Sequence, residues 1–289
     1  MDGFLNVLKP SGPTASDIVV RLKKIFNFSK IGHLGTLDPG AAGVLPIAVG
    51  KGAKLFELLT YKTKHYRTYI TFGVTTDTLD SYGSVTQEMP FTASEDAIIK
   101  AAQTFVGNIF QIPPKYSALS VNGVKAYDLA RSDTDFVLAP RKVTVYSFDL
   151  VRQVNHNTYC FDIVCGGGTY IRSLARDLGQ ALNTVSHMSF LLRTKSGLFD
   201  IEDSTTLDEI SVNPQKFLLP LIYPLSEIKE LIIPDKLYKP LLNGVRLKDW
   251  RSDRIEAGEI TLYKIYCQNE FFGVGSFEEG CLSIKYRLR

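Results

Sequence analysis

Apolar side chains recur along the chain with two periodicities, and the first of them predicts strands. Residues 4–8 form a short apolar run, and residues 66–72 alternate between apolar and polar positions. Residues 159–165 carry a similar pattern. Because a period of two places alternate side chains on one face of a sheet, we expect a sheet whose strands lie far apart in the sequence.

The second periodicity predicts helices. Ser16 can cap a helix that buries Ile18 and Leu22, which are spaced as the inner face of a helix requires. Further helices are expected at residues 93–106 and, after a run of three glycines, at residues 169–178. The chain therefore combines strands with helices that are able to cover a sheet.

A boundary is expected near residues 225–234. The short strand candidates beyond it, separated by Gly-rich turns, are residues 260–266, 271–276 and 282–286. Such spacing is typical of a small β-barrel-like module. We predict a catalytic part at residues 1–228 and a β module at residues 229–289.

Composition and charge narrow the class of protein. With 45% hydrophobic and 22% charged residues among 289, the chain is expected to fold as a globular protein. No apolar run approaches the roughly 20 residues that span a bilayer, and no leader is expected, so the predicted location is the cytoplasm. Residues 1–70 hold ten Lys and Arg against four Asp and Glu. This excess fits a surface that meets phosphates, although a solvated basic face would look the same.

The cysteines and histidines do not indicate a metalloprotein or a disulfide-stabilised protein. The four cysteines and four histidines are scattered, and no CxxC or HExxH motif occurs. We therefore expect neither a disulfide scaffold nor a zinc site.

Residues 32–40, Gly-His-Leu-Gly-Thr-Leu-Asp-Pro-Gly, form the most informative segment. Pro39 biases Asp38 away from helical geometry, and the surrounding glycines let another group approach the backbone closely. A carboxylate on such a loop can act as a nucleophile or a general base. The competing interpretation is an ordinary Asp-Pro turn.

This segment resembles the signature of the TruB family of tRNA pseudouridine synthases, of the bacterial type. Five further motifs match the family in the same order: Lys9-Pro10-Ser11-Gly12, Tyr66-Arg67, Thr76-Asp77-Thr78-Leu79-Asp80, Lys115-Tyr116-Ser117-Ala118-Leu119 and Gly168-Thr169-Tyr170-Ile171-Arg172. The resemblance implies isomerisation of the uridine at position 55, in the T loop of tRNA, after base flipping. It implies no metal and no organic cofactor.

The resemblance also implies the fold. It is α+β: a mixed, mostly antiparallel sheet with flanking helices, followed by a small β-barrel-like module similar to the RNA-binding PUA domain.

Three catalytic residues follow from the matched positions. Asp38 matches the catalytic aspartate, and Arg172 matches its cationic partner. Tyr66 matches a tyrosine that stacks on the target base and takes part in proton transfer. The sequence leaves open whether the carboxylate attacks the nucleoside covalently or abstracts a sugar proton.

Five further positions are expected to bind the substrate. His33 matches the residue that fills the space left by the flipped nucleotide, and Tyr170 and Leu191 match positions that contact the base. Leu191 would also suit a core position. Asp80 matches an acidic position near the cleft, or is a turn residue. Lys9 either contacts phosphate or shapes the turn before Pro10.

Residues 114–142 are rich in Lys, Arg, Tyr and Ser and resemble the family's RNA-gripping insertion. Lys125, Tyr127 and Arg131 are its expected contacts, supplying salt-sensitive affinity. Arg193 is also assigned to RNA gripping, because Leu192-Arg193 stands where family members often carry two arginines.

The chain is expected to act as a monomer. Its expected partner is tRNA, which it contacts at the T arm and at the acceptor end. Neither a membrane nor a guide RNA is expected to take part. Two alternatives remain: a guide-RNA-dependent synthase of the dyskerin-like branch, which shares the aspartate motif, and a non-catalytic tRNA-binding or folding factor. The first alternative predicts that activity requires a guide RNA. An Asp38→Ala variant tests the second, because an enzyme would lose product formation and a folding factor would lose nothing.

Overall fold

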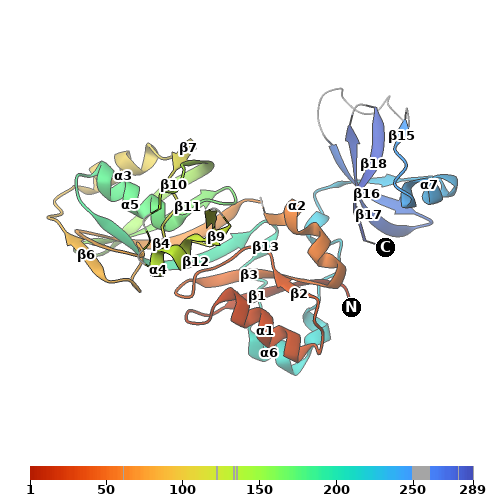
Figure 1. Ribbon diagram of the computed structural model, residues 1–289, viewed down its shortest axis with the longest axis horizontal. Coiled ribbons are helices and arrows are strands. Elements are labelled where there is room, and N and C mark those ends of the chain that lie inside the picture. Colours follow the sequence, from red (N-terminus) through yellow and green to blue (C-terminus); the bar gives the residue numbers. More distant parts are fainter. Residues whose placement is uncertain are drawn as a thin grey trace.

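The computed structural model shows a large mixed sheet followed by a smaller curled sheet at the C-terminal end (Figure 1). It describes residues 1–60, 62–121, 123–132, 134, 136–248, 261–278 and 280–288.

Nine strands of the described residues form the large sheet, which is the frame of the molecule. They are β1 (Gly3–Lys9), β2 (Ile31–His33), β3 (Ala42–Val49), β4 (Lys64–Phe72), β7 (Gly107–Gln111), β10 (Arg141–Asn155), β11 (Thr158–Cys165), β12 (Ser186–Ser196) and β13 (Phe199–Asp200). Their order is β1-β3-β12-β4-β11-β10-β7, with β2 beside β3 and β13 beside β12. The expected strands at 4–8, 66–72 and 159–165 are confirmed as β1, β4 and β11.

The centre of this sheet joins two halves of the chain. β12 pairs with β4 in antiparallel fashion and with β3 in parallel fashion, at Leu192 and Arg193. The other neighbours along the order are antiparallel. The predicted mixed, mostly antiparallel sheet is therefore confirmed, and its one parallel joint lies beside the Asp38 loop.

Helices cover both halves of the sheet (Figure 1). α3 (Glu95–Gln103) and α5 (Ile171–Ala181) pack near β10 and β12, whereas α1 (Ala15–Ile25) and α6 (Leu207–Val212) pack near β1 and β2. Ile18, Leu22 and Leu174 belong to the shared apolar core between helices and sheet, as helical spacing predicted.

The starts of all three predicted helices differ from the sequence prediction, and α3 begins at Glu95 rather than at residue 93. Thr14, not Ser16, caps α1, because the Thr14 hydroxyl accepts from the Asp17 N–H and the Asp17 carboxylate accepts from the Thr14 N–H in a capping box. α5 begins at Ile171 rather than 169, since Tyr170 keeps an extended backbone as the N-cap. The Asp38 loop lies between two strands, because β2 ends at His33 and β3 begins at Ala42.

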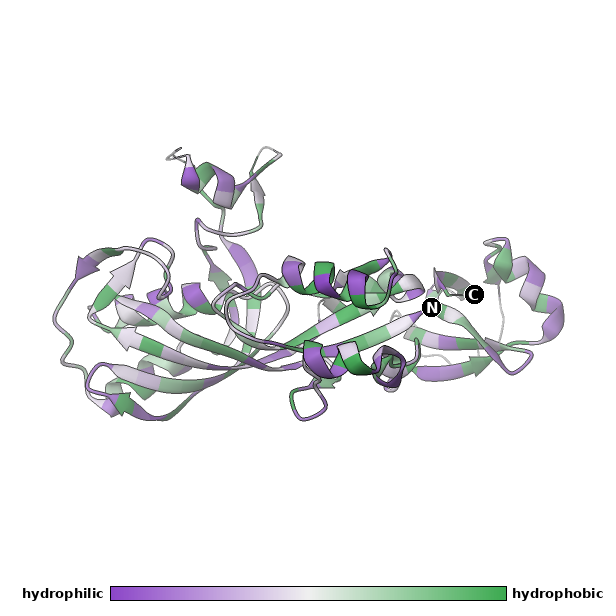
Figure 2. Cartoon of the chain, turned by 90° about the horizontal axis from the view of Figure 1, so that it is seen from below, coloured by the Kyte–Doolittle hydropathy of each residue, from purple (hydrophilic) through white to green (hydrophobic). Residues whose placement is uncertain are grey.

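Smaller elements surround the sheet. They are α2 (Phe56–Thr60), the hairpin of β5 (Val74–Thr76) and β6 (Val85–Glu88), and four short 3₁₀ helices at Gly50–Leu55, Pro214–Phe217, Tyr223–Leu225 and Asp235–Leu237. The expected insertion holds β8 (Ser120–Val121), β9 (Val124–Lys125) and α4 (Ala126–Arg131), and it projects away from the sheet (Figure 2). Asn122, between β8 and β9, lies outside the described residues.

The C-terminal sheet has the order β14-β16-β17-β18-β15. Its elements are β14 (Lys229–Ile232), α7 (Tyr238–Leu242), β15 (Leu247–Lys248), β16 (Thr261–Cys267), β17 (Glu270–Glu278) and β18 (Cys281–Arg287). Val274 and Leu288 share one apolar cluster with Leu55 and Leu225, so this sheet packs against the larger part. A curled sheet is consistent with the predicted PUA-like module. None of the helices in the described ranges is long and apolar enough to cross a membrane.

Candidate active site

Asp38 lies on the loop between β2 and β3, where the chain turns back sharply. The Ala41 N–H donates to the Asp38 carbonyl oxygen at 3.0 Å, which closes the turn around Pro39. The Asp38 side chain faces a cleft whose other walls include Asp80, Tyr82, Phe190 and Leu191. The most unusual segment of the sequence therefore borders a concave surface, as an active site requires.

Arg172 holds the Asp38 carboxylate. Its Nε lies 3.0 Å from Asp38 Oδ2, and its Nη1 lies 3.6 Å from Asp80 Oδ2. The same guanidinium donates to the carbonyl oxygens of Thr78 and Tyr116, each at 3.0 Å. Because four groups from three loops share one planar guanidinium, its direction is fixed before any substrate arrives.

The exposed fractions show which member of this cluster a substrate can touch. The Asp38 side chain is 35% exposed, whereas those of Arg172 and Asp80 are 7% and 13% exposed. Burial raises the pKa of the Asp38 carboxyl above its usual range, Arg172 opposes this, and Asp80 adds to it. The carboxylate is thus accessible from the cleft, and the arginine favours its charged form.

Lys9 supports the Asp38 loop from below. Its fully buried Nζ donates to the carbonyl oxygens of Pro10 (2.9 Å), Pro39 (3.2 Å) and Ala41 (2.6 Å). Burial lowers the pKa of Lys9 from 10.5 to about 8, although the Asp38 carboxylate opposes the shift. Of the two roles expected for Lys9, its position fits the shaping of the turn, since a buried ammonium does not meet phosphate.

Arg193 supports the other side of the same loop. Its 1% exposed side chain donates to the carbonyl oxygens of Val44 (2.7 Å, from Nε), Thr36 (3.2 Å, from Nη1) and Gly35 (3.3 Å, from Nη2). β3 passes so close that a Cβ on Gly43 would lie 2.2 Å from the Arg193 carbonyl oxygen, so only glycine fits there. The RNA-gripping role expected for Arg193 is therefore corrected, because the structure buries this guanidinium.

Tyr66 lies on β4, at the centre of the sheet, and belongs to its apolar core. It is the cross-strand partner of Arg193 on β12, and it is 9% exposed. Burial raises the pKa of the Tyr66 hydroxyl, with a small contribution from the Asp38 charge. A tyrosine kept neutral beside a carboxylate can donate or relay a proton.

The other residues expected to bind the substrate are His33, Leu191 and Tyr170, of which Leu191 lines the cleft. His33 Nδ1 is buried without a hydrogen-bond partner among the described residues, and burial lowers the pKa of His33. Leu191, 7% exposed, lines the cleft and also belongs to the apolar core. Tyr170 is fixed through its backbone, because Gln111 accepts from its N–H at 2.9 Å and donates to its carbonyl oxygen at 3.1 Å.

The insertion residues lie apart from this pocket. Lys125, Tyr127 and Arg131 are all exposed, and the Arg131 guanidinium lies 5.7 Å from the centre of the Tyr127 ring. A stacked Tyr–Arg pair and a neighbouring lysine offer the ring faces and charges that RNA backbones meet.

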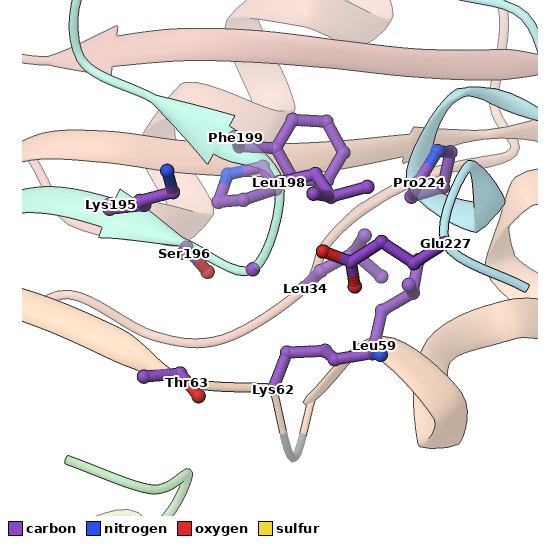
Figure 3. Close-up of a pocket in the computed structure, with 12 residues that line it drawn as sticks. Leu34, Leu59, Lys62, Thr63, Lys195, Ser196, Leu198, Phe199, Pro224 and Glu227 are labelled. Carbon is purple, nitrogen blue, oxygen red and sulfur yellow. The ribbon is translucent and has the colours of Figure 1, made fainter. Parts of the chain in front are cut away.

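A second cavity lies behind the loop, next to Leu34 (Figure 3). Lys62, Lys195 and Glu227 line it, and the Glu227 carboxylate points into it. Leu34 is the one matched motif residue among its lining residues, and Asp38, Tyr66 and Arg172 do not line it, so we do not assign it to catalysis. Within the described ranges, no three His, Cys, Asp or Glu side chains are placed to hold a metal ion.

Sequence reasoning missed three residues at the site. Tyr116 was part of a matched motif but had no role, and its carbonyl oxygen holds Arg172. Gln111 fixes Tyr170 from a strand far away in sequence, and Tyr82 borders the cleft from a polar turn. The neighbouring residues Ile112-Pro113-Pro114 could have drawn attention to Gln111, and the Thr-Asp-Thr-Leu-Asp motif could have drawn attention to Tyr82.

Two family models match the chain. Residues 23–171 match the N-terminal domain of the TruB family pseudouridylate synthases, and residues 172–228 match the C-terminal domain of tRNA pseudouridylate synthase B. A protein of Alkaliphilus oremlandii named tRNA pseudouridine synthase B is 39% identical over 95% of this chain and 93% of its own. A protein of the same name from Caldanaerobacter subterraneus is 46% identical over 73% of this chain and 74% of its own.

Solved structures agree at the level of the fold. A chain in the crystal structure of a Cbf5–Nop10–Gar1 complex is 25% identical, with a TM-score of 0.75 over 99% of this chain and 85% of its own. A chain of an H/ACA RNP bound to a substrate RNA containing 2′-deoxyuridine gives a TM-score of 0.73 at 23% identity, covering 99% of this chain and 85% of that one. From these matches and from the motifs gathered around Asp38, the chain belongs to the TruB family of pseudouridylate synthases.

Proposed function

We propose that this enzyme converts the uridine at position 55, in the T loop of tRNA, into pseudouridine, with Asp38 as the catalytic carboxylate. Several separate sequence motifs come together around the Asp38 carboxylate, and this convergence is the observation that carries the proposal. Asp38 is the accessible member of a cluster whose other groups, Arg172 and Lys9, hold it from behind. The relatives named tRNA pseudouridine synthase B support tRNA as the substrate.

The reaction is an isomerisation that balances without a co-reactant. The bond between N1 of uracil and C1′ of ribose breaks, the base rotates, and a bond forms between C5 and C1′. The proton on C5 is lost, and N1 carries one in the product. Asp38 either attacks C1′ or removes a sugar proton, and both steps need the ionised carboxylate that Arg172 favours.

The other pocket residues receive roles from their positions. Tyr66 stacks against the uracil and carries a proton, since burial keeps its hydroxyl neutral and the Asp38 charge acts on it. Leu191 and Tyr170 contact the base, and His33 fills the place that the flipped nucleotide leaves.

Base flipping follows from the shape of the site. The carboxylate lies in a cleft rather than on a flat surface, so a nucleotide within a stacked loop cannot reach it. Lys125, Tyr127 and Arg131 on the projecting insertion would hold the T arm while the nucleotide turns out. We propose residues 1–228 as the catalytic unit and residues 229–289 as a PUA-like unit for more distant RNA.

We further propose that the enzyme acts as a monomer and needs no guide RNA. The bacterial relatives that match almost the whole chain carry the name of a tRNA enzyme, whereas the chains of the H/ACA RNP and the Cbf5–Nop10–Gar1 complex share the fold at lower identity.

The test is tritium release from uridine labelled at C5, in an unmodified tRNA transcript with no guide RNA added. We expect one equivalent of label released per transcript, and none from a transcript with cytidine at position 55. Release that requires a guide-containing RNA would contradict the stand-alone function, and release from the cytidine-55 transcript would contradict the site. An Asp38→Asn variant that still binds tRNA but releases no label would exclude a pure folding factor.

A further inference from the structure

Tyr82 stands at the mouth of the cleft in an unusual way for an aromatic residue. It is 69% exposed, although aromatic rings gain most by burial. Both Tyr82 and Asp38 line the same cleft. No catalytic or binding role described above uses this ring.

The turn that carries Tyr82 is fixed to the sheet on both sides of Asp80. The Met188 N–H donates to the Leu79 carbonyl oxygen at 3.0 Å. The Ser81 hydroxyl donates to the Ser189 carbonyl oxygen at 3.2 Å, at a bulge of β12. The position of the turn is therefore set by the strand that also supplies the cleft wall.

The ring itself is held as well. The Tyr82 N–H donates to Asp80 Oδ1 at 3.0 Å, and the Tyr82 hydroxyl lies 3.2 Å from Ser11 Oγ, which donates to the Gly40 carbonyl oxygen at 3.0 Å. The ring lies directly over Gly40: a Cβ there would come 2.0 Å from its Cε2 atom. Because these contacts leave the exposed ring few other conformations, it loses little conformational entropy when a ligand covers it.

A second exposed ring faces the cleft from β12. Phe190 is 37% exposed, and its ring centre lies 5.0 Å from that of Tyr69 behind it. Phe190 and Tyr82 therefore place apolar ring surface on the walls beside Asp38, where a single-stranded RNA segment would enter.

We infer that the Tyr82 ring is a stacking platform for the nucleobase next to the target uridine. This inference rests on the proposed function. When one nucleotide leaves a stacked loop, its neighbour loses a stacking partner. Proteins that hold unstacked bases supply exposed aromatic rings for them. Tyr82 thus recognises an unpaired base by its flat face and positions the target without touching the reacting atoms.

The test compares Tyr82→Ala and Tyr82→Phe on T-arm hairpins. Base–aromatic stacking predicts a KM and a dissociation constant roughly 5- to 150-fold higher for Tyr82→Ala, with kcat little changed. Tyr82→Phe keeps the ring and should remain within about threefold of the native enzyme. Ser11→Ala removes the partner of the Tyr82 hydroxyl, and its hydrogen bond to Gly40, but keeps the ring; it serves as the matched control and should resemble Tyr82→Phe.

Abasic hairpins separate stacking from support of the loop. Removing the base immediately 5′ or 3′ of the target should abolish the Tyr82→Ala penalty for one of the two hairpins, because the stacked base is already missing. An equal penalty on every hairpin, an equal loss with Tyr82→Phe, or no penalty at all would overturn the inference. Failure of the native enzyme to convert the intact hairpin would instead contradict the proposed function.

Discussion

Arg193 offers the sharpest contrast between the sequence prediction and the structure. As an RNA-gripping residue, it would be exposed and would contribute charge to binding. In the structure its guanidinium is buried and holds the carbonyl oxygens of Val44, Thr36 and Gly35, which shape the Asp38 loop. An Arg193→Met variant, similar in length but unable to donate, distinguishes these roles.

The magnitude follows from the lost hydrogen bonds. Leaving one buried carbonyl oxygen unpaired costs about 1–3 kcal/mol, and the three losses overlap because they share one loop. We therefore expect a total of about 3–5 kcal/mol, less than three independent losses at their full cost. For a chain of this size, at roughly 2 °C per kcal/mol, that loss lowers Tm by about 6–10 °C, and kcat falls because the loop no longer fixes Asp38.

The assay combines a thermal melt with tRNA binding over a range of salt concentrations. Loop support predicts a large drop in Tm with an unchanged slope of log affinity against log salt. Arg131→Met, on the exposed insertion, is the matched control and should reduce that slope by about one while leaving Tm unchanged. Arg193→Lys should recover only part of Tm, because one ammonium cannot replace a fork of donors. A native Tm with a reduced salt slope in Arg193→Met would refute the reasoning.

Three further outcomes are expected. Arg172 lowers the pKa of the Asp38 carboxyl against the effect of burial, so Arg172→Met should move the acid limb of the kcat/KM profile to higher pH; an unmoved limb would count against the ion pair. The Lys64 ammonium is buried without a hydrogen-bond partner among the described residues, so Lys64→Met should raise Tm by about 2–6 °C. Burial lowers the pKa of Lys64 from 10.5 to about 8; the unfolded chain therefore binds more protons between these values, and stability should rise with pH across that window, less so in Lys64→Met, in melts at pH 8 and 10. Tyr66→Phe keeps the ring but not the proton, so single-turnover rates should fall about 100-fold with tRNA affinity retained; an unchanged rate would limit Tyr66 to stacking.

Local patterns were enough to predict the framework. The strands β1, β4 and β11 follow from apolar runs, and α1 follows from Ile18 and Leu22. These signals work because each element buries one face. The cap of α1 was misplaced by two residues, because Thr14 and Ser16 both suit an N-cap and only the Asp17 contact decides between them.

The direction of a side chain relative to the cleft was beyond the sequence. Leu192-Arg193 on a strand gives no sign that β3 will pass over it and bury the guanidinium. Lys9 looked equally suited to phosphate or to a turn until the Pro39 and Ala41 carbonyl oxygens came to lie around it. Tyr82 sits in a polar turn, and only the approach of Gly40, forty residues earlier in the chain, makes its ring part of the site.

The role of Asp38 is the claim on which the mechanism depends. Asp38→Asn keeps the size of the side chain and removes only its charge and basicity. In a single-turnover reaction with excess enzyme, pseudouridine at position 55 should form about 10⁴-fold more slowly or not at all, while tRNA affinity and Tm stay close to native values. Pseudouridine formed at a rate near that of the native enzyme would show that the carboxylate is not the catalytic group.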